Sequence, residues 1–157
     1  VGRDAVRYFL LMRKSDSQLV FDVDVARAQS EENPVYYIQM AHARLCGIFR
    51  VGELAPDAIT GAGVEWGALV EDDERELVKA LLGFPGLVTA AARTLAPHLV
   101  ATYLLDTARL VHTWYHKHHV LGEPEPVRSA RLALARAAQV VLANGLAILG
   151  ISAPERM

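Results

Sequence analysis

The feature that most constrains the fold is a long apolar stretch near the end of the sequence, residues 127–149. Its apolar residues do not gather on one face of a helix but surround it almost completely. A helix that is hydrophobic on all sides is normally buried at the centre of a bundle. Gly150 is expected to end it, because glycine commonly terminates helices. The apolar residues are Leu132, Leu134, Val140, Val141, Leu142, Leu146 and Leu149.

The other predicted helices are amphipathic or short. Asn33 and Pro34 form the clearest start signal, because asparagine caps a helix and proline fits its first position. The stretch Phe84-Pro85-Gly86 predicts a break, and residues 14–17 and 51–70 predict loops. No strand or repeat is predicted, so the fold class is all-α, a helical bundle. The predicted helices span residues 3–13, 22–26, 34–50, 72–82, Pro85 to before Pro97, and 97–119.

Two large aromatic residues continue the apolar stripe of the helix predicted over residues 97–119. Tyr103 and Trp114 fall on the same stripe as Leu99 and Leu110. Aromatic residues at helical spacing on a buried stripe are typical of a hydrophobic core. We therefore expect both rings in the core rather than on an accessible surface.

Charge and composition narrow the class of protein. The net charge of −2 is not typical of a strongly basic nucleic-acid binder. Residues 51–93 carry 3 basic and 8 acidic residues, whereas both ends are mildly positive, so an RNA partner is expected at the ends. Cys46 is the only cysteine, which rules out an intrachain disulfide and favours a cytoplasmic location. No charge-free apolar run approaches the roughly 18 residues of a membrane span, so no membrane partner is predicted.

Several strings in this sequence together resemble the arginyl-tRNA synthetase family. The resemblance extends over essentially the whole chain, and the string around His42 is the most specific. Met40 departs from the family pattern, which usually has tyrosine at that place. A base that would stack on that tyrosine is left with the Met40 thioether, Tyr36 or Tyr37. The strings are Gly2-Arg3-Asp4-Ala5-Val6-Arg7-Tyr8, Phe21-Asp22-Val23-Asp24, Asn33-Pro34-Val35-Tyr36-Tyr37, Ile38-Gln39-Met40-Ala41-His42-Ala43-Arg44, and the end from Leu146 to Met157.

This resemblance implies a fold, a parent activity and partners. It implies that residues 1–30 form the connection from a catalytic domain and residues 31–157 form a helical anticodon-binding (DALR) domain of the class I synthetase type. The parent would attach arginine to its tRNA with ATP and magnesium in that upstream domain. The family's HIGH-like and KMSK-like motifs are absent, so no catalytic residue and no cofactor are predicted here. Val1 is not methionine, so we expect the chain to begin inside a longer protein. The implied partners are arginine tRNA and the upstream catalytic domain, with no DNA.

The helix that begins at Pro34 carries the first group of candidate tRNA-binding residues. Exposed bases are bound by stacking on aromatic rings and by hydrogen bonds to base edges. Gln39 and His42 are three residues apart and share one face, while Arg44 points elsewhere. These residues, with Tyr36, are predicted to contact RNA or to position the helix that does. The alternative is that Gln39 and His42 are polar groups that only pack against the neighbouring connection.

The second group lies near the end of the helix predicted over 97–119, where several histidines and Tyr115 gather. The resemblance implies that Tyr115 and His119 lie in the anticodon pocket. An alternative is a metal site on His112, His116 and His119, although a histidine pair four apart is a weak signal without further ligands. The resemblance also implies Met157 beside a base. Three arginines are candidates for phosphate contacts, with a solvated helix face as the alternative: Arg128, Arg131 and Arg136.

A rival interpretation is a helical protein-interaction module without an RNA role. The net charge of −2 favours it, and it predicts an exposed apolar patch and a protein partner. An enzyme in isolation is the least favoured class, because the sequence shows no phosphate-binding glycine loop and no paired nucleophile and base. The candidate tRNA-binding set is therefore Tyr36, Gln39, His42, Arg44, Tyr115, His119, Arg131 and Met157, with no metal ligand.

Overall fold

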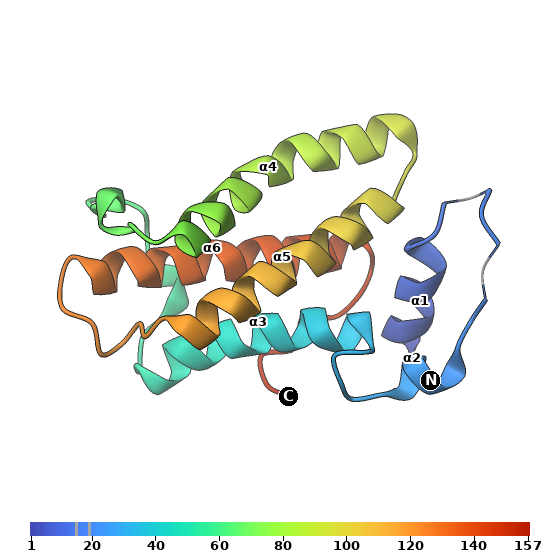
Figure 1. Ribbon diagram of the computed structural model, residues 1–157, viewed down its shortest axis with the longest axis horizontal. Coiled ribbons are helices and arrows are strands. Elements are labelled where there is room, and N and C mark those ends of the chain that lie inside the picture. The colour runs from blue at the N-terminus through green and yellow to red at the C-terminus, as the bar shows by residue number, and fades with distance from the viewer. Residues whose placement is uncertain (15, 19) are drawn as a thin grey trace.

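The computed structural model describes residues 1–14, 16–18 and 20–157, and Figure 1 shows helices joined by loops. Within those residues there is no strand, so the predicted all-α class is confirmed. Two single-turn 3-10 helices, η1 (Pro56–Ala58) and η2 (Trp66–Ala68), lie in the segment predicted as a loop. The α-helices are α1 (Arg3–Leu11), α2 (Val23–Arg27), α3 (Pro34–Val51), α4 (Asp72–Thr94), α5 (His98–Lys117) and α6 (Val127–Ile148).

Helices α3, α5 and α6 pack against one another and make the body of the bundle (Figure 1). Helix α4 packs along α5 and also touches α6, while α1 and α2 lie together at one end. The core is the apolar centre of this arrangement, and its largest fully buried side chains come from all four long helices. They include Ile38, Leu45, Phe49, Leu77, Leu104, Trp114, Leu134, Leu142 and Leu146.

Helix α6 is the central helix that the sequence predicts. Gly145 lies so close to Leu104 of α5 that a Cβ atom there would clash, so glycine permits the close approach of the two helices. By length and apolar composition alone α6 is long enough to cross a membrane. Half of its most apolar window is buried inside the bundle, however, as in the core helix of a globular protein.

Helix α4 corrects one prediction. It runs without interruption through Pro85, where the sequence predicts two separate helices. Pro85 is itself exposed, and because proline has no N–H group the carbonyl of Leu81, one turn earlier, lacks its helical hydrogen bond. On the inner side, Phe84 stacks on Tyr103 of α5 with ring centroids 5.5 Å apart, and the Tyr103 hydroxyl donates to the carbonyl of Ala80. Packing on α5 thus stabilises both halves of α4 in one line.

Several helix boundaries also differ from the predictions by one or two residues. Helix α5 ends at Lys117, because His118 adopts an extended backbone conformation. His118 and His119 therefore belong to the connection between α5 and α6 rather than to the helix. Helix α1 ends at Leu11, and the loop predicted over residues 14–17 includes Ser15, which lies outside the described residues.

Of the two large aromatic residues that the sequence places in the core, Trp114 is confirmed as a core residue and Tyr103 is not. Trp114 is fully buried, and Tyr103 is half-buried between α4 and α5. The hydroxyl of Tyr103 has a partner in the carbonyl of Ala80, at 2.8 Å. The Trp114 ring is therefore inaccessible, while the Tyr103 ring is partly covered by its stacking partner Phe84.

The first thirty residues pack onto the bundle through α1. Tyr8 is buried, and its hydroxyl donates to the carbonyl of Ala101 on α5 at 2.9 Å. Arg7 donates from Nε to the carbonyl of Leu149 at 3.1 Å. The predicted division between a connecting segment and a binding domain at residue 30 stays a prediction.

Candidate nucleic-acid interface

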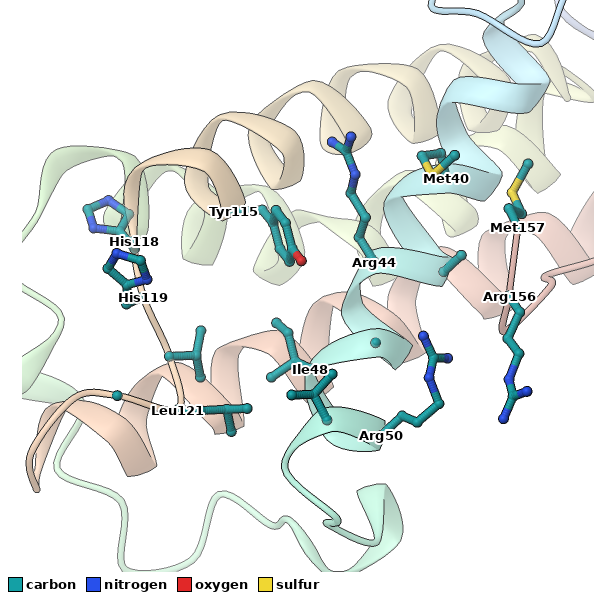
Figure 2. A pocket seen from close by; sticks show the side chains of 15 residues that line it. Met40, Arg44, Ile48, Arg50, Tyr115, His118, His119, Leu121, Arg156 and Met157 are labelled. Carbon is teal, nitrogen blue, oxygen red and sulfur yellow. The ribbon is translucent and has the colours of Figure 1, made fainter.

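A cavity of about 850 Å³ opens between α3, the end of α5, the α5–α6 connection and the C-terminal tail (residues 149–157). Figure 2 shows His118 and His119 at one side and Arg156 and Met157 at the other. The 15 residues that line it include three arginines and neither aspartate nor glutamate, so its lining side chains carry an excess of positive charge. They are Met40, Ala43, Arg44, Gly47, Ile48, Arg50, Val51, Tyr115, His118, His119, Val120, Leu121, Gly122, Arg156 and Met157.

Helix α3 supplies one wall of this cavity. The side chain of Asn33 caps its first turn by accepting hydrogen bonds from two backbone N–H groups, and Pro34 occupies the first helical position. Residues four apart lie on one face of a helix. Met40, Arg44 and Ile48 therefore point together into the cavity, while the opposite face of α3 is buried in the core.

Arg44 reaches from α3 to α5 and meets two histidines there. Its Nη1 atom donates to Nδ1 of His112 at 2.8 Å and to Nε2 of His116 at 3.2 Å. The guanidinium carbon also lies 5.7 Å from the centroid of the Tyr115 ring, within the range of a cation–π contact. Arg44 and Tyr115, which the sequence predicts as separate tRNA-binding residues, thus meet at the cavity although 71 residues separate them in sequence.

The tail forms another wall, and polar side chains of α3 bind its backbone. Gln39 donates from Nε2 to the carbonyl of Ser152 at 3.0 Å and to a carboxylate oxygen of Asp4 at 3.0 Å. A ring nitrogen of His42 lies 2.9 Å from the carbonyl of Pro154. Arg50 donates to the carbonyl of Glu155 at 3.4 Å. Gln39 and His42 therefore position the tail, which brings the last two residues of the chain to the cavity.

Arg131 lies behind the cavity wall rather than on a solvated face. It is 8% exposed, and its Nε donates to Oε1 of the fully buried Glu74 at 2.7 Å. Its Nη1 donates to Oε1 of Glu123 at 3.2 Å and to the carbonyl of His119 at 2.9 Å, and its Nη2 lies 3.3 Å from Nδ1 of His118. The solvated helix face is therefore wrong for this residue, whose donors hold the α5–α6 connection, while its contact with tRNA stays a prediction.

His118 is fixed from the other side by Asp73 of α4. Its Nε2 lies 2.9 Å from Oδ1 of Asp73, while Lys117 lies 3.3 Å from Oδ2. Burial acts to raise the pKa of Asp73, but the hydrogen bonds and charges of His118 and Lys117 outweigh it, so that pKa is lowered. The carboxylate is therefore ionised at neutral pH and anchors the start of the connection.

The structure divides the predicted site residues into three groups. Arg44, Tyr115, His119 and Met157 meet at the cavity, whereas Gln39, His42 and Arg131 hold its walls in place. Tyr36 lies at a smaller hollow of about 310 Å³ between α1, α2 and α3. Residues that sequence reasoning did not select but that line the cavity are Ile48, Arg50, His118, Leu121 and Arg156.

Of these missed residues, Ile48 had a usable signal, because it follows Arg44 by one helical turn. Arg50 and Arg156 had none, since only the fold brings them together. Of the histidines in the alternative metal site, His112 and His116 each place one ring nitrogen within hydrogen-bond distance of Arg44. Among the described residues no group of three or more histidine, cysteine, aspartate or glutamate side chains is placed to hold a metal ion.

Comparison with known proteins assigns the family. The sequence profile of the DALR anticodon binding domain matches residues 38–157, which is more than half of the chain. The chain belongs to this family. Because the match includes α5, α6 and most of α3, all the elements that surround the cavity lie inside the DALR domain.

Curated relatives of this DALR domain are named arginine–tRNA ligases. The proteins of Bordetella petrii and Geotalea daltonii are each 48% identical over 157 and 158 residues. These alignments cover the whole of this chain and 28% of each relative. The solved arginyl-tRNA synthetase of Thermus thermophilus is 32% identical, with a TM-score of 0.83, and covers 98% of this chain and 26% of that one. The resemblance stated from the sequence and the predicted bundle type are therefore confirmed.

Proposed function

We propose that this chain binds arginine tRNA through the cavity and reads its anticodon. The observation that carries the proposal is the contact of Arg44 with Tyr115 in a cavity that no aspartate or glutamate side chain lines and that also contains Arg50 and Arg156. Recognition of single-stranded RNA uses aromatic or guanidinium planes for base stacking and positive charge for phosphates. The cavity offers both at one place, on a chain whose net charge is slightly negative.

The roles in RNA binding follow from position. Tyr115 is 38% exposed, so one face of its ring is accessible for stacking. Arg44 lies beside this ring, and Arg50 and Arg156 add two further guanidinium groups to the cavity lining. Met157, half-exposed at the end of the tail, supplies an apolar contact. His119 lines the opposite side of the cavity with donor and acceptor nitrogens.

The chain spans little more than a quarter of the length of its curated relatives. As part of such a ligase, this domain would contribute binding energy for the tRNA and help to orient it, at a distance from the site of the chemical reaction. ATP with magnesium, and the attachment of arginine to the tRNA, belong in this proposal to an upstream catalytic domain of the same protein. The exposed apolar side chains of Val6 and Leu10 on α1 suit contact with that domain. The proposed location is the cytoplasm.

A salt-dependent titration tests the anticodon function. Arginine tRNA and the same tRNA with its anticodon replaced are titrated into the chain at several salt concentrations. We expect tighter binding to the native anticodon and an affinity that falls steeply with salt. Equal affinity for both RNAs would overturn anticodon reading. The match to the DALR anticodon binding domain favours this function over that of a protein-interaction module without an RNA role.

A further inference from the structure

The acceptors that hold Arg44 are unusual for an arginine at the edge of a protein core. Both are histidine nitrogens, Nδ1 of His112 and Nε2 of His116, and both take their hydrogen bond from Nη1. Among the described residues, no carboxylate lies within 4.0 Å of the Arg44 guanidinium. The positive charge of Arg44 is therefore held in place without being neutralised.

The hydrogen-bond geometry requires that His112 be neutral. Its Nε2 lies 3.0 Å from the carbonyl of Tyr37 and must donate there, which leaves Nδ1 with the lone pair that accepts from Arg44. Burial lowers the pKa of His112, and the charges of Arg44 and His116 act in the same direction. An imidazolium has no lone pair, so either histidine would lose its bond to Arg44 on protonation.

Arg44 keeps donors for a ligand. A guanidinium group carries five N–H donors, of which Nη1 supplies two. Those two are directed at the histidines, while Nη2 and Nε make no hydrogen bond within the described residues. Figure 2 shows the side chain extending beside Tyr115 at the cavity. A guanidinium with free adjacent donors suits bidentate binding of a phosphate.

We propose that His112 and His116 are positioning residues that present Arg44, fully charged, as the receptor for one phosphate of an RNA bound in the cavity. A carboxylate in their place would hold the guanidinium equally well, but it would cancel the charge that attracts the phosphate. Neutral imidazoles fix the side chain and leave its charge to the ligand. This inference rests on the proposed function, in that the RNA occupies the same cavity.

Position 116 allows a matched test, because His116 is exposed and substitution there does not disturb the core. His116→Gln retains a neutral hydrogen-bond acceptor at this position. His116→Glu has a side chain of the same shape as glutamine but carries a negative charge. Thr113→Glu, on an exposed position of α5 outside the cavity lining, controls for the added negative charge. Each variant is titrated with arginine tRNA across salt concentrations, and circular dichroism checks that helicity is unchanged.

We expect His116→Gln to bind within about threefold of the unmodified chain with the same salt dependence, since it keeps an acceptor. His116→Glu should bind about tenfold more weakly, the size of one lost charge-assisted hydrogen bond. The slope of log affinity against log salt should also become shallower by about 0.7, the contribution of one phosphate of a single strand. In an Arg44→Gln background the same substitution should do no more than Thr113→Glu.

Equal affinities and equal slopes for the Gln and Glu variants would overturn the phosphate receptor. If the unmodified chain shows no anticodon preference but His116→Glu still loses one phosphate from the slope, the proposed anticodon function fails and the receptor is supported. If the unmodified chain binds no tRNA, both proposals are overturned.

Discussion

Arg131 and Arg44 of this DALR domain are held by different kinds of hydrogen-bond partner. The comparison distinguishes an arginine that stabilises the fold from one whose charge is available to a ligand. Arg131 is buried behind the cavity wall against two carboxylates, Glu74 and Glu123. Arg44 borders the cavity and is held by two histidines without a carboxylate. A buried charge is strongly destabilising unless it is paired, whereas a charge without a carboxylate partner remains available to an anionic ligand. The carboxylate partners of Arg131 therefore indicate a structural role. The histidine partners of Arg44 leave its positive charge available to a ligand.

The largest expected effect comes from breaking the Arg131 cluster. Arg131→Met removes the partner of Glu74, which is fully buried, and leaves its carboxylate uncompensated. Loss of one member of a buried ion pair costs about 3–5 kcal/mol of the free energy of unfolding. Urea unfolding measures this loss directly.

The control for that experiment is Arg128→Met on the same helix. Arg128 makes an exposed ion pair with Glu125 at 2.9 Å, and such pairs contribute at most about 1 kcal/mol. Similar losses for Arg128→Met and Arg131→Met would contradict the structural role assigned to the buried cluster.

The next largest effect falls on RNA affinity. Arg44→Gln removes the guanidinium from the cavity and should weaken tRNA binding about ten- to a hundredfold, while the free energy of unfolding changes by about 1 kcal/mol or less. Fluorescence titration and urea unfolding of the same preparation give both quantities. If Arg44→Gln loses stability as Arg131→Met does and keeps its RNA affinity, the distinction between the two arginines is wrong.

Stacking on Tyr115 gives an effect of similar size on RNA affinity. Tyr115→Ala should cost about 1–3 kcal/mol of binding free energy, the usual contribution of one stacked base. Tyr115→Phe keeps the ring and should bind nearly as well as the unmodified chain. The two variants are compared in the tRNA titration, and equal affinities for them would exclude base stacking at this ring.

The smallest effect is a dependence of stability on pH through His112. Its pKa is lowered in the folded state, mainly by burial, so the unfolded chain takes up the proton first as the pH falls. The stabilisation is complete above about pH 6.5 and is lost as the pH falls through the folded pKa, with a slope of at most about 1.4 kcal/mol per pH unit. Arg44 and His116 act with burial, while the Tyr37 carbonyl and Glu31 oppose it.

Unfolding in urea at pH values between 7.5 and 5 measures this dependence. His112→Asn retains an acceptor for Arg44 but has no titrating ring, so its stability should fall less steeply than that of the unmodified chain. Identical pH profiles for the two proteins would show that His112 is not held neutral.

The sequence predicted most of the fold because most of the fold is local. The apolar surround of residues 127–149, the cap at Asn33 and the stripe containing Trp114 each follow from helical spacing within a single segment. The prediction of a break at Pro85 was wrong because the packing of α4 on α5 outweighs the local preference of proline. That packing is a tertiary contact and cannot be inferred from the local sequence pattern.

The candidate site was predicted less completely, because the roles of its residues depend on partners distant in sequence. Arg131 has a structural role because it donates a hydrogen bond to Glu74, which lies 57 residues earlier. Gln39 has one because it donates to the carbonyl of Ser152, which lies 113 residues later. The spacing of His112 and His116 was noticed from the sequence, but their shared partner Arg44 lies on another helix. The sequence was enough to select candidate residues by their type. The role of each residue could be assigned only from its contacts in the folded structure.

Hydrogen exchange with and without arginine tRNA tests the central claim, that RNA binds at this cavity. The α5–α6 connection (residues 118–122) and the tail have non-helical backbone beside the cavity, so binding there should slow their amide exchange. The account predicts protection of these two segments and unchanged exchange at the turn between α4 and α5, residues 95–97. Binding without protection of the connection and the tail, or with protection confined to the α4–α5 turn, would contradict it.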